Sequence, residues 1–249
     1  LSLTVNSQTS PDYPMMNKYR QWSFVAGASL YNKGKAIQQY GNYTIETLPM
    51  MSYNAGFEYD FHPDRQWSFI SGMYVALEPG YNVEYSINEE DMFPQFGAET
   101  ERYHAYGITT FSFPFLVSLK KQVHKKMLAN LRVGLKAMYF PPGGLYLGVS
   151  YHNEDDTDVR EMFGLYADSP RNSWQGSFVV GTGMHLMEKY GLLKAQLFYV
   201  MNFQNTMKGE YLYGNLLQSG DSRGYYKLSG NYVGLLFSYS FKKRKPDYY

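Results

Sequence analysis

The feature that most constrains the fold of this chain is an alternation of apolar and small or polar residues that recurs along its length. In the stretch GNYVGLLFSYSF (230–241), apolar or aromatic side chains occupy the odd-numbered positions from Val233 to Phe241, and between them stand Gly234, Leu236, Ser238 and Ser240. A period of two is typical of a β-strand whose two faces meet different surroundings. The same pattern recurs at 22–32, 51–61, 67–86, 102–119, 127–139, 174–186 and 193–203. The sequence therefore predicts an all-β chain of eight strands.

The lengths of the connections predict how these strands are joined. Short connections at 62–66, 120–126 and 188–191 alternate with long ones at roughly 34–49, 87–101, 140–173 and 204–228. This rhythm is typical of an antiparallel up-and-down transmembrane β-barrel, with short periplasmic turns and long extracellular loops. An even number of strands places both termini on the periplasmic side. We expect three parts: an irregular N-terminal lead-in at 1–20, an outer-membrane β-barrel at 21–243 and a short periplasmic tail at 244–249.

Composition argues against some classes of protein and leaves others open. The chain has 249 residues and no Cys, which leaves no disulfide framework, thiolate metal site or Cys nucleophile. A net charge of +1 gives no argument for a nucleic-acid partner. Mean hydropathy is −0.43, which is usual for a soluble protein, but barrel strands are half polar and leave only a weak hydropathy signal. Residues 1–20 lack a basic and an apolar signal region, so we expect any signal peptide to have been removed.

Alternation alone leaves two surroundings open for the apolar face, the core of a soluble barrel or sandwich and a lipid bilayer. The polar face favours lipid, because it is rich in Gly, Ser, Asn and Gln and carries scattered charges of both signs. Small residues suit the tight interior of an eight-stranded barrel, where opposite charges can pair. We expect a lumen charge network of Glu58, Asp60, Glu78, Arg102, Arg132, Lys136 and Lys194.

Aromatic residues near the strand ends also favour lipid. Two aromatic girdles mark the two interfaces of a membrane barrel. The predicted interface aromatics are Trp22, Phe61, Trp67 and Phe241 near the short turns, and Tyr139, Trp174 and Phe203 near the long loops. The final strand ends on an aromatic residue, Phe241, which resembles the C-terminal signal read by the barrel-assembly machinery of Gram-negative bacteria.

Three segments carry a resemblance to a known group of proteins. They are FSFPFLVSLKK at 111–121, the Gly-rich SFVVGTGMHL at 177–186, and GNYVGLLFSYSF at the end. In their style and order, over about 21–241, the chain resembles the small outer-membrane β-barrel proteins of Bacteroidota, the PorT-like and OmpA-barrel-like group. The resemblance implies an eight-stranded outer-membrane barrel. It implies no single activity, because members serve as accessory subunits of secretion, assembly or uptake machines.

The predicted periplasmic rim is basic and the predicted external loops are acidic. The rim lysines and arginine are Lys120, Lys121, Lys125, Lys126, Lys242, Lys243, Arg244 and Lys245. Acidic residues gather at 88–92 and 153–158. The basic charges either solvate the turns and anchor the barrel at the interface, or bind an acidic periplasmic partner. We expect outer-membrane lipid and lipopolysaccharide as surroundings, other outer-membrane or periplasmic subunits as partners, and no nucleic acid.

No segment of the sequence identifies a catalytic residue, a cofactor or a metal. Ser150, His152 and Glu154 are spaced two apart and would share one face of a strand, as in a lipid-hydrolysing enzyme, but a polar loop explains them better. A small-ligand-binding barrel would need a lumen emptier than these side chains suggest. The apolar third loop predicts an ordered extension of the fifth and sixth strands or a surface that packs on another subunit. The sequence thus favours a non-enzymatic accessory barrel over the two alternatives.

Overall fold

The computed structural model describes residues 13–92, 98–152, 159–170 and 173–243. These residues form an all-β protein with 14 strands, β1 to β14, and two short 3-10 helices. None of the described helices is long and apolar enough to cross a membrane. Residues 1–12 of the predicted lead-in, residues 153–158 of the predicted third loop and the predicted tail at 244–249 lie outside the described residues.

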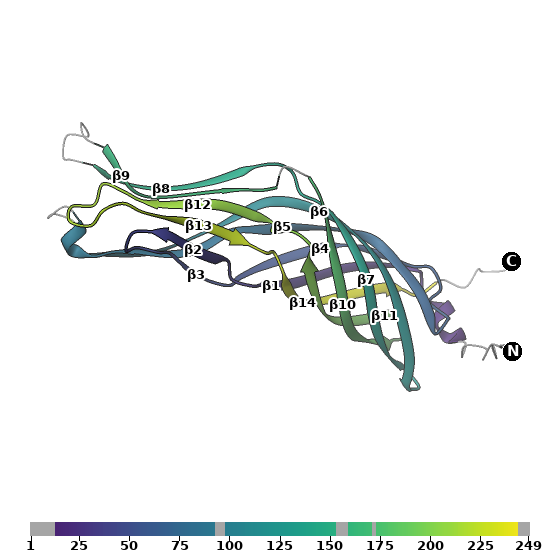
Figure 1. Cartoon of the computed structure of the whole chain (residues 1–249). Helices are drawn as coiled ribbons and strands as arrows, with labels where there is room; N and C mark the ends of the chain where they lie inside the picture. The colour runs from purple at the N-terminus through teal and green to yellow at the C-terminus, as the bar shows by residue number, and fades with distance from the viewer. Residues whose placement is uncertain (1–12, 93–97, 153–158, 171–172, 244–249) are drawn as a thin grey trace, which may run out of the picture.

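Eight antiparallel strands close into a ring at the end of the molecule that carries both termini (Figure 1). Their order around the ring is β5-β4-β1-β14-β11-β10-β7-β6, and β6 closes the ring on β5. The ring strands are β1 (Trp22–Tyr31), β4 (Met50–Asp60), β5 (Trp67–Ile87), β6 (Glu99–His124), β7 (Met127–Tyr139), β10 (Trp174–Met187), β11 (Gly191–Asn202) and β14 (Tyr232–Phe241). The eight strands predicted from the alternation are therefore confirmed as a closed ring.

The connections predicted as long loops are largely ordered as further strands. A second sheet of five strands runs in the order β2-β13-β12-β9-β8. Its strands are β2 (Lys35–Tyr40), β13 (Ser222–Leu228), β12 (Met207–Tyr213), β9 (Val159–Asp168) and β8 (Gly144–His152). The short β3 (Glu46–Thr47) pairs with β5, and the 3-10 helix η2 (Glu89–Asp91) follows β5. Figure 1 shows these elements reaching far beyond the ring; we call them the extension.

β5 and β6 are long enough to belong to both the ring and the extension. A bulge between the two parts changes which face of each strand points inwards. In the ring, even-numbered residues of β5 such as Ile70 and Tyr74 are buried, whereas beyond the bulge the odd-numbered Val83 and Tyr85 are buried. The register with β6 shifts between Glu78 and Tyr81. The pairing skips Gly107 on β6 and Gly80 on β5, so each strand has one extra residue here, and an extra residue turns every later side chain to the other face of its strand. The bulge therefore lets one hairpin line the ring with polar groups and the extension with apolar ones.

The extension has the main apolar core of the protein. It joins the far half of β5 to the inner face of the second sheet. At its centre the ring of Phe163 stacks on Tyr85, with centroids 4.6 Å apart, and packs at a tilt against Tyr213, with centroids 4.9 Å apart. All three side chains are almost completely buried. The described residues of the third long loop form β8 and β9, which pair with each other, and β9 also pairs with β12. This agrees with an ordered extension, the first of the two alternatives that its apolar residues predicted.

The N-terminal segment closes the opposite end of the ring. The 3-10 helix η1 (Pro14–Lys18) begins with Pro, whose fixed φ and missing N–H suit a first helical position. Tyr13, Met16 and Tyr19 are buried here against Leu128 and Leu192 of the ring. This segment, which the sequence predicts as irregular, therefore caps one mouth of the ring, while the extension covers the other.

Candidate functional site

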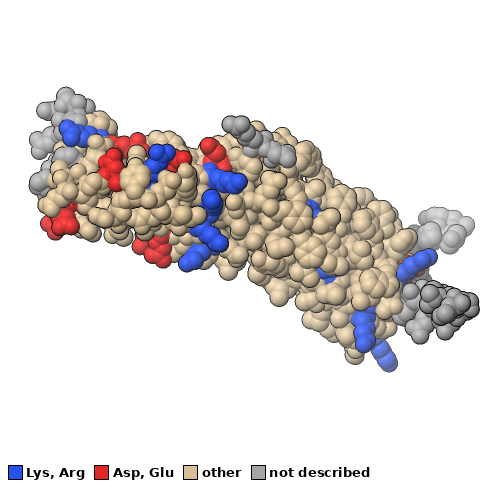
Figure 2. Space-filling view, in the orientation of Figure 1, with Lys and Arg blue, Asp and Glu red and all other residues tan. Residues whose placement is uncertain are grey.

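The outward face of the ring is apolar around its circumference. Every ring strand exposes large apolar side chains at alternate positions, and Figure 2 shows the ring as a mostly uncharged zone between charged ends. We call this surface the apolar belt, which includes Phe24, Leu30, Met51, Phe69, Leu77, Phe115, Leu131, Leu135, Met184, Leu197, Met201, Leu235 and Phe237. On β5 the belt runs from Trp67 to Leu77, about 33 Å along the strand and about 25 Å along the axis of a typically tilted ring.

The predicted interface aromatics lie at the two edges of this belt. Trp22, Trp67 and Phe241 are about half exposed near the capped end of the ring, as is Phe61, which follows β4. At the other edge, Tyr139 of β7 pairs with Trp174 of β10, their rings 5.4 Å apart, and Phe203 follows β11. The structure thus brings the seven aromatics into two bands.

The interior of the ring holds charged side chains that are almost completely buried. Arg132 on β7 and Glu58 on β4 form an ion pair, with Nη1 2.8 Å from Oε1. The hydroxyl of Tyr74 donates a second hydrogen bond to the same carboxylate oxygen at 2.5 Å. Burial of a charge is costly unless the charge is paired and hydrogen-bonded. Arg132, Glu58 and Tyr74 therefore link three strands across the ring interior.

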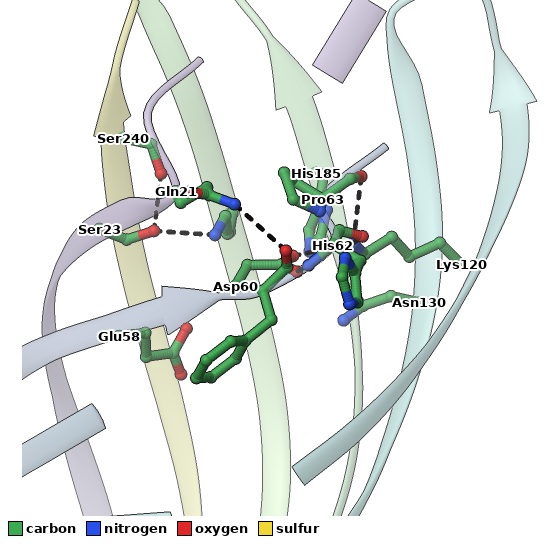
Figure 3. Close-up of polar contacts among 12 residues, drawn as sticks. Gln21, Ser23, Glu58, Asp60, His62, Pro63, Lys120, Asn130, His185 and Ser240 are labelled. Atoms are coloured by element: carbon green, nitrogen blue, oxygen red, sulfur yellow. Dashed lines mark hydrogen bonds and ion pairs between the residues drawn. The ribbon is translucent and has the colours of Figure 1, made fainter. Parts of the chain in front are cut away.

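A second buried ion pair lies closer to the capped end (Figure 3), and it includes a residue that the sequence predicted elsewhere. Lys120 was expected in the solvated basic rim, but its ammonium group is fully buried and lies 2.8 Å from Oδ2 of Asp60. It also donates to the backbone oxygen of Pro63 at 3.1 Å. Ser118 and Lys120 lie two residues apart on β6, so both side chains point into the ring. Extending the predicted alternation by one more pair of residues would have placed Lys120 in the interior.

Three other predicted network residues are also buried in the ring. Lys194 donates to Oγ of Ser23 at 2.8 Å, and Lys136 donates to the hydroxyl of Tyr232 at 2.9 Å. The carboxylate of Glu78 accepts a long hydrogen bond, 3.5 Å, from Thr110. Seven charged groups therefore lie inside the ring: Glu58, Asp60, Glu78, Lys120, Arg132, Lys136 and Lys194.

Arg102 is the predicted network residue that the structure places elsewhere. It lies exposed on the far part of β6, beyond the bulge, where its Nε donates to Oδ1 of Asn82 at 3.2 Å. The reversed alternation in the extension is the physical reason, because even-numbered residues of β6 no longer face the ring interior there. The local sequence signals of the bulge are the Pro79-Gly80 step on β5 and Gly107 on β6.

The ring interior is filled. The cavity between the buried charges has a volume of about 40 Å³ and is lined by groups that include Glu58, Glu78, Arg132 and Lys136. It has room for a few water molecules at most. Oε2 of Glu58, Oε2 of Glu78 and Nη2 of Arg132 have no protein partner among the described residues, so water in this cavity would complete their hydrogen bonds.

His185 and Phe198 also fill the ring, and no motif in the sequence singles them out. His185 is completely buried and its Nε2 lies 3.5 Å from Nε2 of Gln196. Phe198 occupies space that glycines leave free, since a Cβ on Gly234 would lie 2.3 Å from its ring and one on Gly181 would lie 2.8 Å from its Cβ. An eight-stranded ring is just wide enough for its side chains to fill, so small and large residues must alternate inside it.

The remaining predicted rim residues that the structure describes are exposed at the capped end. They are Lys121, Lys125, Lys126, Lys242 and Lys243. Arg244 and Lys245 lie outside the described residues, as does Glu154 of the Ser150–His152–Glu154 triplet. Ser150 is exposed on β8, where its register partner is Glu161 of β9. Over the described part of the chain, no group of His, Asp and Glu side chains is arranged to hold a metal ion.

Together these observations define a closed and filled eight-stranded ring with an apolar outer surface, a charged interior and an ordered β-extension. No protein-family model matches the chain, and no curated protein matches it. Among solved structures, it is similar to the outer membrane protein OprG from Pseudomonas aeruginosa, at 10% identity and a TM-score of 0.40 over 90% of this chain and 98% of that chain. The outer membrane protease OmpT from Escherichia coli matches at 10% identity, with a TM-score of 0.35 and the same coverage. Similarity at this level identifies neither a family nor an activity.

Proposed function

We propose that the ring is a transmembrane β-barrel of a bacterial outer membrane, with both termini in the periplasm. The observation that carries this proposal is that the polarity of the ring is the reverse of that of a soluble protein. Phe, Leu and Met side chains are exposed on its outside, and ion pairs such as Arg132–Glu58 are buried inside. A soluble protein rarely exposes so large a continuous apolar surface. The belt height of about 25 Å also suits the apolar band of outer-membrane barrels.

The barrel acts as a non-enzymatic accessory or structural subunit of an outer-membrane complex. It is a member of the small outer-membrane barrel proteins of Bacteroidota. Two features support this role. The filled interior, with a cavity of about 40 Å³, suits neither a solute channel nor a small-ligand-binding barrel. The extension has its own core, so it presents a rigid outer sheet for contacts outside the membrane.

Mild detergent extraction from the native membrane, native-size separation and mass spectrometry test the subunit role. We expect the chain to migrate with other proteins at fixed stoichiometry. A chain that migrates alone at barrel size would contradict this role. The Ser150→Ala variant is the control for the alternative, a lipid-modifying enzyme: the account predicts an unchanged lipid profile in cells, and a changed profile would favour the enzyme.

A further inference from the structure

The outer face of the second sheet carries a row of lysines just beyond the apolar belt. Lys35 on β2 is the register partner of Lys227 on β13, and Lys227 is the register partner of Lys208 on β12. All three side chains are exposed. Figure 2 shows blue atoms gathered across the molecule where the extension meets the ring. Three positive charges therefore lie side by side on three adjacent strands.

This arrangement is unfavourable for an unliganded sheet. Side chains that face each other directly across antiparallel strands have Cβ atoms about 5 Å apart, and like charges there are destabilising. Among the described residues, none of the three ammonium groups lies within ion-pairing distance of a carboxylate. The nearest acid in the row is Asp168, the register partner of Lys208. The row therefore keeps an excess of positive charge, which a bound anion would neutralise.

A groove lies directly beside the row. It has a volume of about 580 Å³, and Lys208 and Lys227 line it together with Asp168, Glu210, Tyr166 and Tyr225. Glu210 is engaged by Arg223, with which it forms an ion pair, so its charge is balanced within the sheet. Tyr166 and Tyr225 are both partly exposed and flank Glu210 in register. The groove thus joins two ammonium groups to two aromatic side chains, and Asp168, the register partner of Lys208, offsets one of the two positive charges.

We propose that this groove binds the phosphorylated sugar headgroup of a glycolipid in the same membrane. Ammonium groups bind phosphate oxygens through charge-assisted hydrogen bonds, and the C–H face of a sugar packs on an exposed aromatic ring. Lys35 of β2 follows Leu30, the last belt residue of β1, by five positions, so it lies within about 18 Å of the apolar belt. This depth suits a sugar phosphate attached to an acyl chain that lies against the belt. The inference rests on the proposed membrane position of the ring.

The test uses the full chain in zwitterionic detergent and measures glycolipid binding by native mass spectrometry. The probes are bisphosphorylated lipid A and the same lipid without phosphates. We expect preferential binding of the phosphorylated form, weakened at least about tenfold by the double variant Lys208→Gln/Lys227→Gln. The matched control, Lys121→Gln/Lys125→Gln, removes the same charge at the capped end and should bind like the parent chain. Equal binding of both lipids, or equal loss in both variants, would overturn the proposal.

A second readout separates the groove from a general effect of charge. In lipid-free detergent, Lys227→Gln removes like-charge repulsion on both sides of the central lysine, so its melting temperature should rise above that of the parent chain. With phosphorylated glycolipid bound, the parent chain should instead have the higher melting temperature of the two. If Lys227→Gln lowers the melting temperature in the absence of ligand, the claim that the three lysines destabilise the sheet is contradicted.

Soluble glucosamine 6-phosphate distinguishes failure of this inference from failure of the membrane assignment. It should compete with the phosphorylated lipid for the groove, and inorganic phosphate at the same concentration should compete more weakly. If the sugar phosphate binds the groove in a chain that does not enter a bilayer, the groove stands and the proposed function fails. If the chain enters the bilayer and the Lys208/Lys227 variant binds both lipids like the parent chain, the groove inference alone fails. Equal competition by inorganic phosphate would overturn the sugar assignment.

Discussion

At the scale of single residues, stability of the ring depends on whether each buried charge keeps its partner. Arg132 and Glu58 are both almost fully buried, and their closest polar atoms are 2.8 Å apart. Two charges removed from water gain little net stability from their pairing, but removing one partner leaves the other uncompensated. The ring is therefore tolerant of replacing the pair and intolerant of breaking it.

The substitution Arg132→Met tests this asymmetry. We expect it to lower the free energy of unfolding by about 3–5 kcal/mol, because Glu58 then remains as a buried, unpaired carboxylate. The double variant Glu58→Gln/Arg132→Met should recover much of that loss. Urea unfolding in lipid micelles, followed by tryptophan fluorescence, provides the measurement.

The surface pair Glu210–Arg223 provides a matched control for the buried pair. Both of its side chains are exposed, so Arg223→Met should change the unfolding midpoint little. If the single variant Arg132→Met were as stable as the double variant, the buried pair would not have the role assigned to it.

At the scale of elements, the carboxylate of Asp91 connects three segments of the extension. These are η2 itself, the segment after β2 and the connection between β12 and β13. Asp91 of η2 is fully buried and accepts hydrogen bonds from the hydroxyl of Tyr43 at 2.5 Å and from the backbone N–H groups of Gln218 and Ser219 at 3.0 and 2.5 Å. Burial alone would raise the pKa of Asp91, but these hydrogen bonds outweigh it and lower the pKa below the ordinary value of 3.8. A carboxyl group with a lowered pKa stabilises the fold above its unfolded pKa, and that stability is lost as pH falls through the folded pKa.

The variant Asp91→Asn tests this connection. At neutral pH, we expect hydrogen exchange at the amides of Gln218 and Ser219 to become at least about tenfold faster, because the charged acceptor is lost. In the parent chain the same protection should fall as pH drops below about 4, and the variant should lack this pH dependence. Glu90→Gln, which changes the exposed neighbouring carboxylate, is the control and should leave both results unaltered. Parent-like protection in Asp91→Asn would contradict the connection.

The sequence predicts the elements of the ring well and those of the extension poorly. Alternating residues such as Val233 and Leu235 face one environment along a whole strand, so pattern and structure agree for all eight ring strands. The strands β12 and β13 carry the same alternation, with Tyr211 and Tyr213 inside and Lys208 outside, but they are short and polar enough to resemble loops. The bulge after Glu78 is set by tertiary packing rather than by pattern, so the placement of Arg102 was predicted wrongly.

At the scale of the whole molecule, three zones follow one another along the long axis (Figure 1). The cap and its lysines lie at the end with the termini, the apolar belt surrounds the filled ring, and the extension carries most of the acidic and tyrosine-rich surface. Solvation explains this order if a bilayer surrounds the belt and water surrounds both ends. The central claim of the account is therefore that the belt lies in lipid.

The chain has only three tryptophans, Trp22, Trp67 and Trp174, and all of them lie half exposed at the edges of the belt. Their fluorescence in bilayers of lipids brominated at successive acyl positions tests the central claim most directly. We predict that bromines near the headgroups quench them most strongly, and that a tryptophan placed at mid-belt by Phe115→Trp is quenched best by bromines near the chain ends. Emission typical of water-exposed tryptophan, with no quenching by bromine at any depth, would contradict the account.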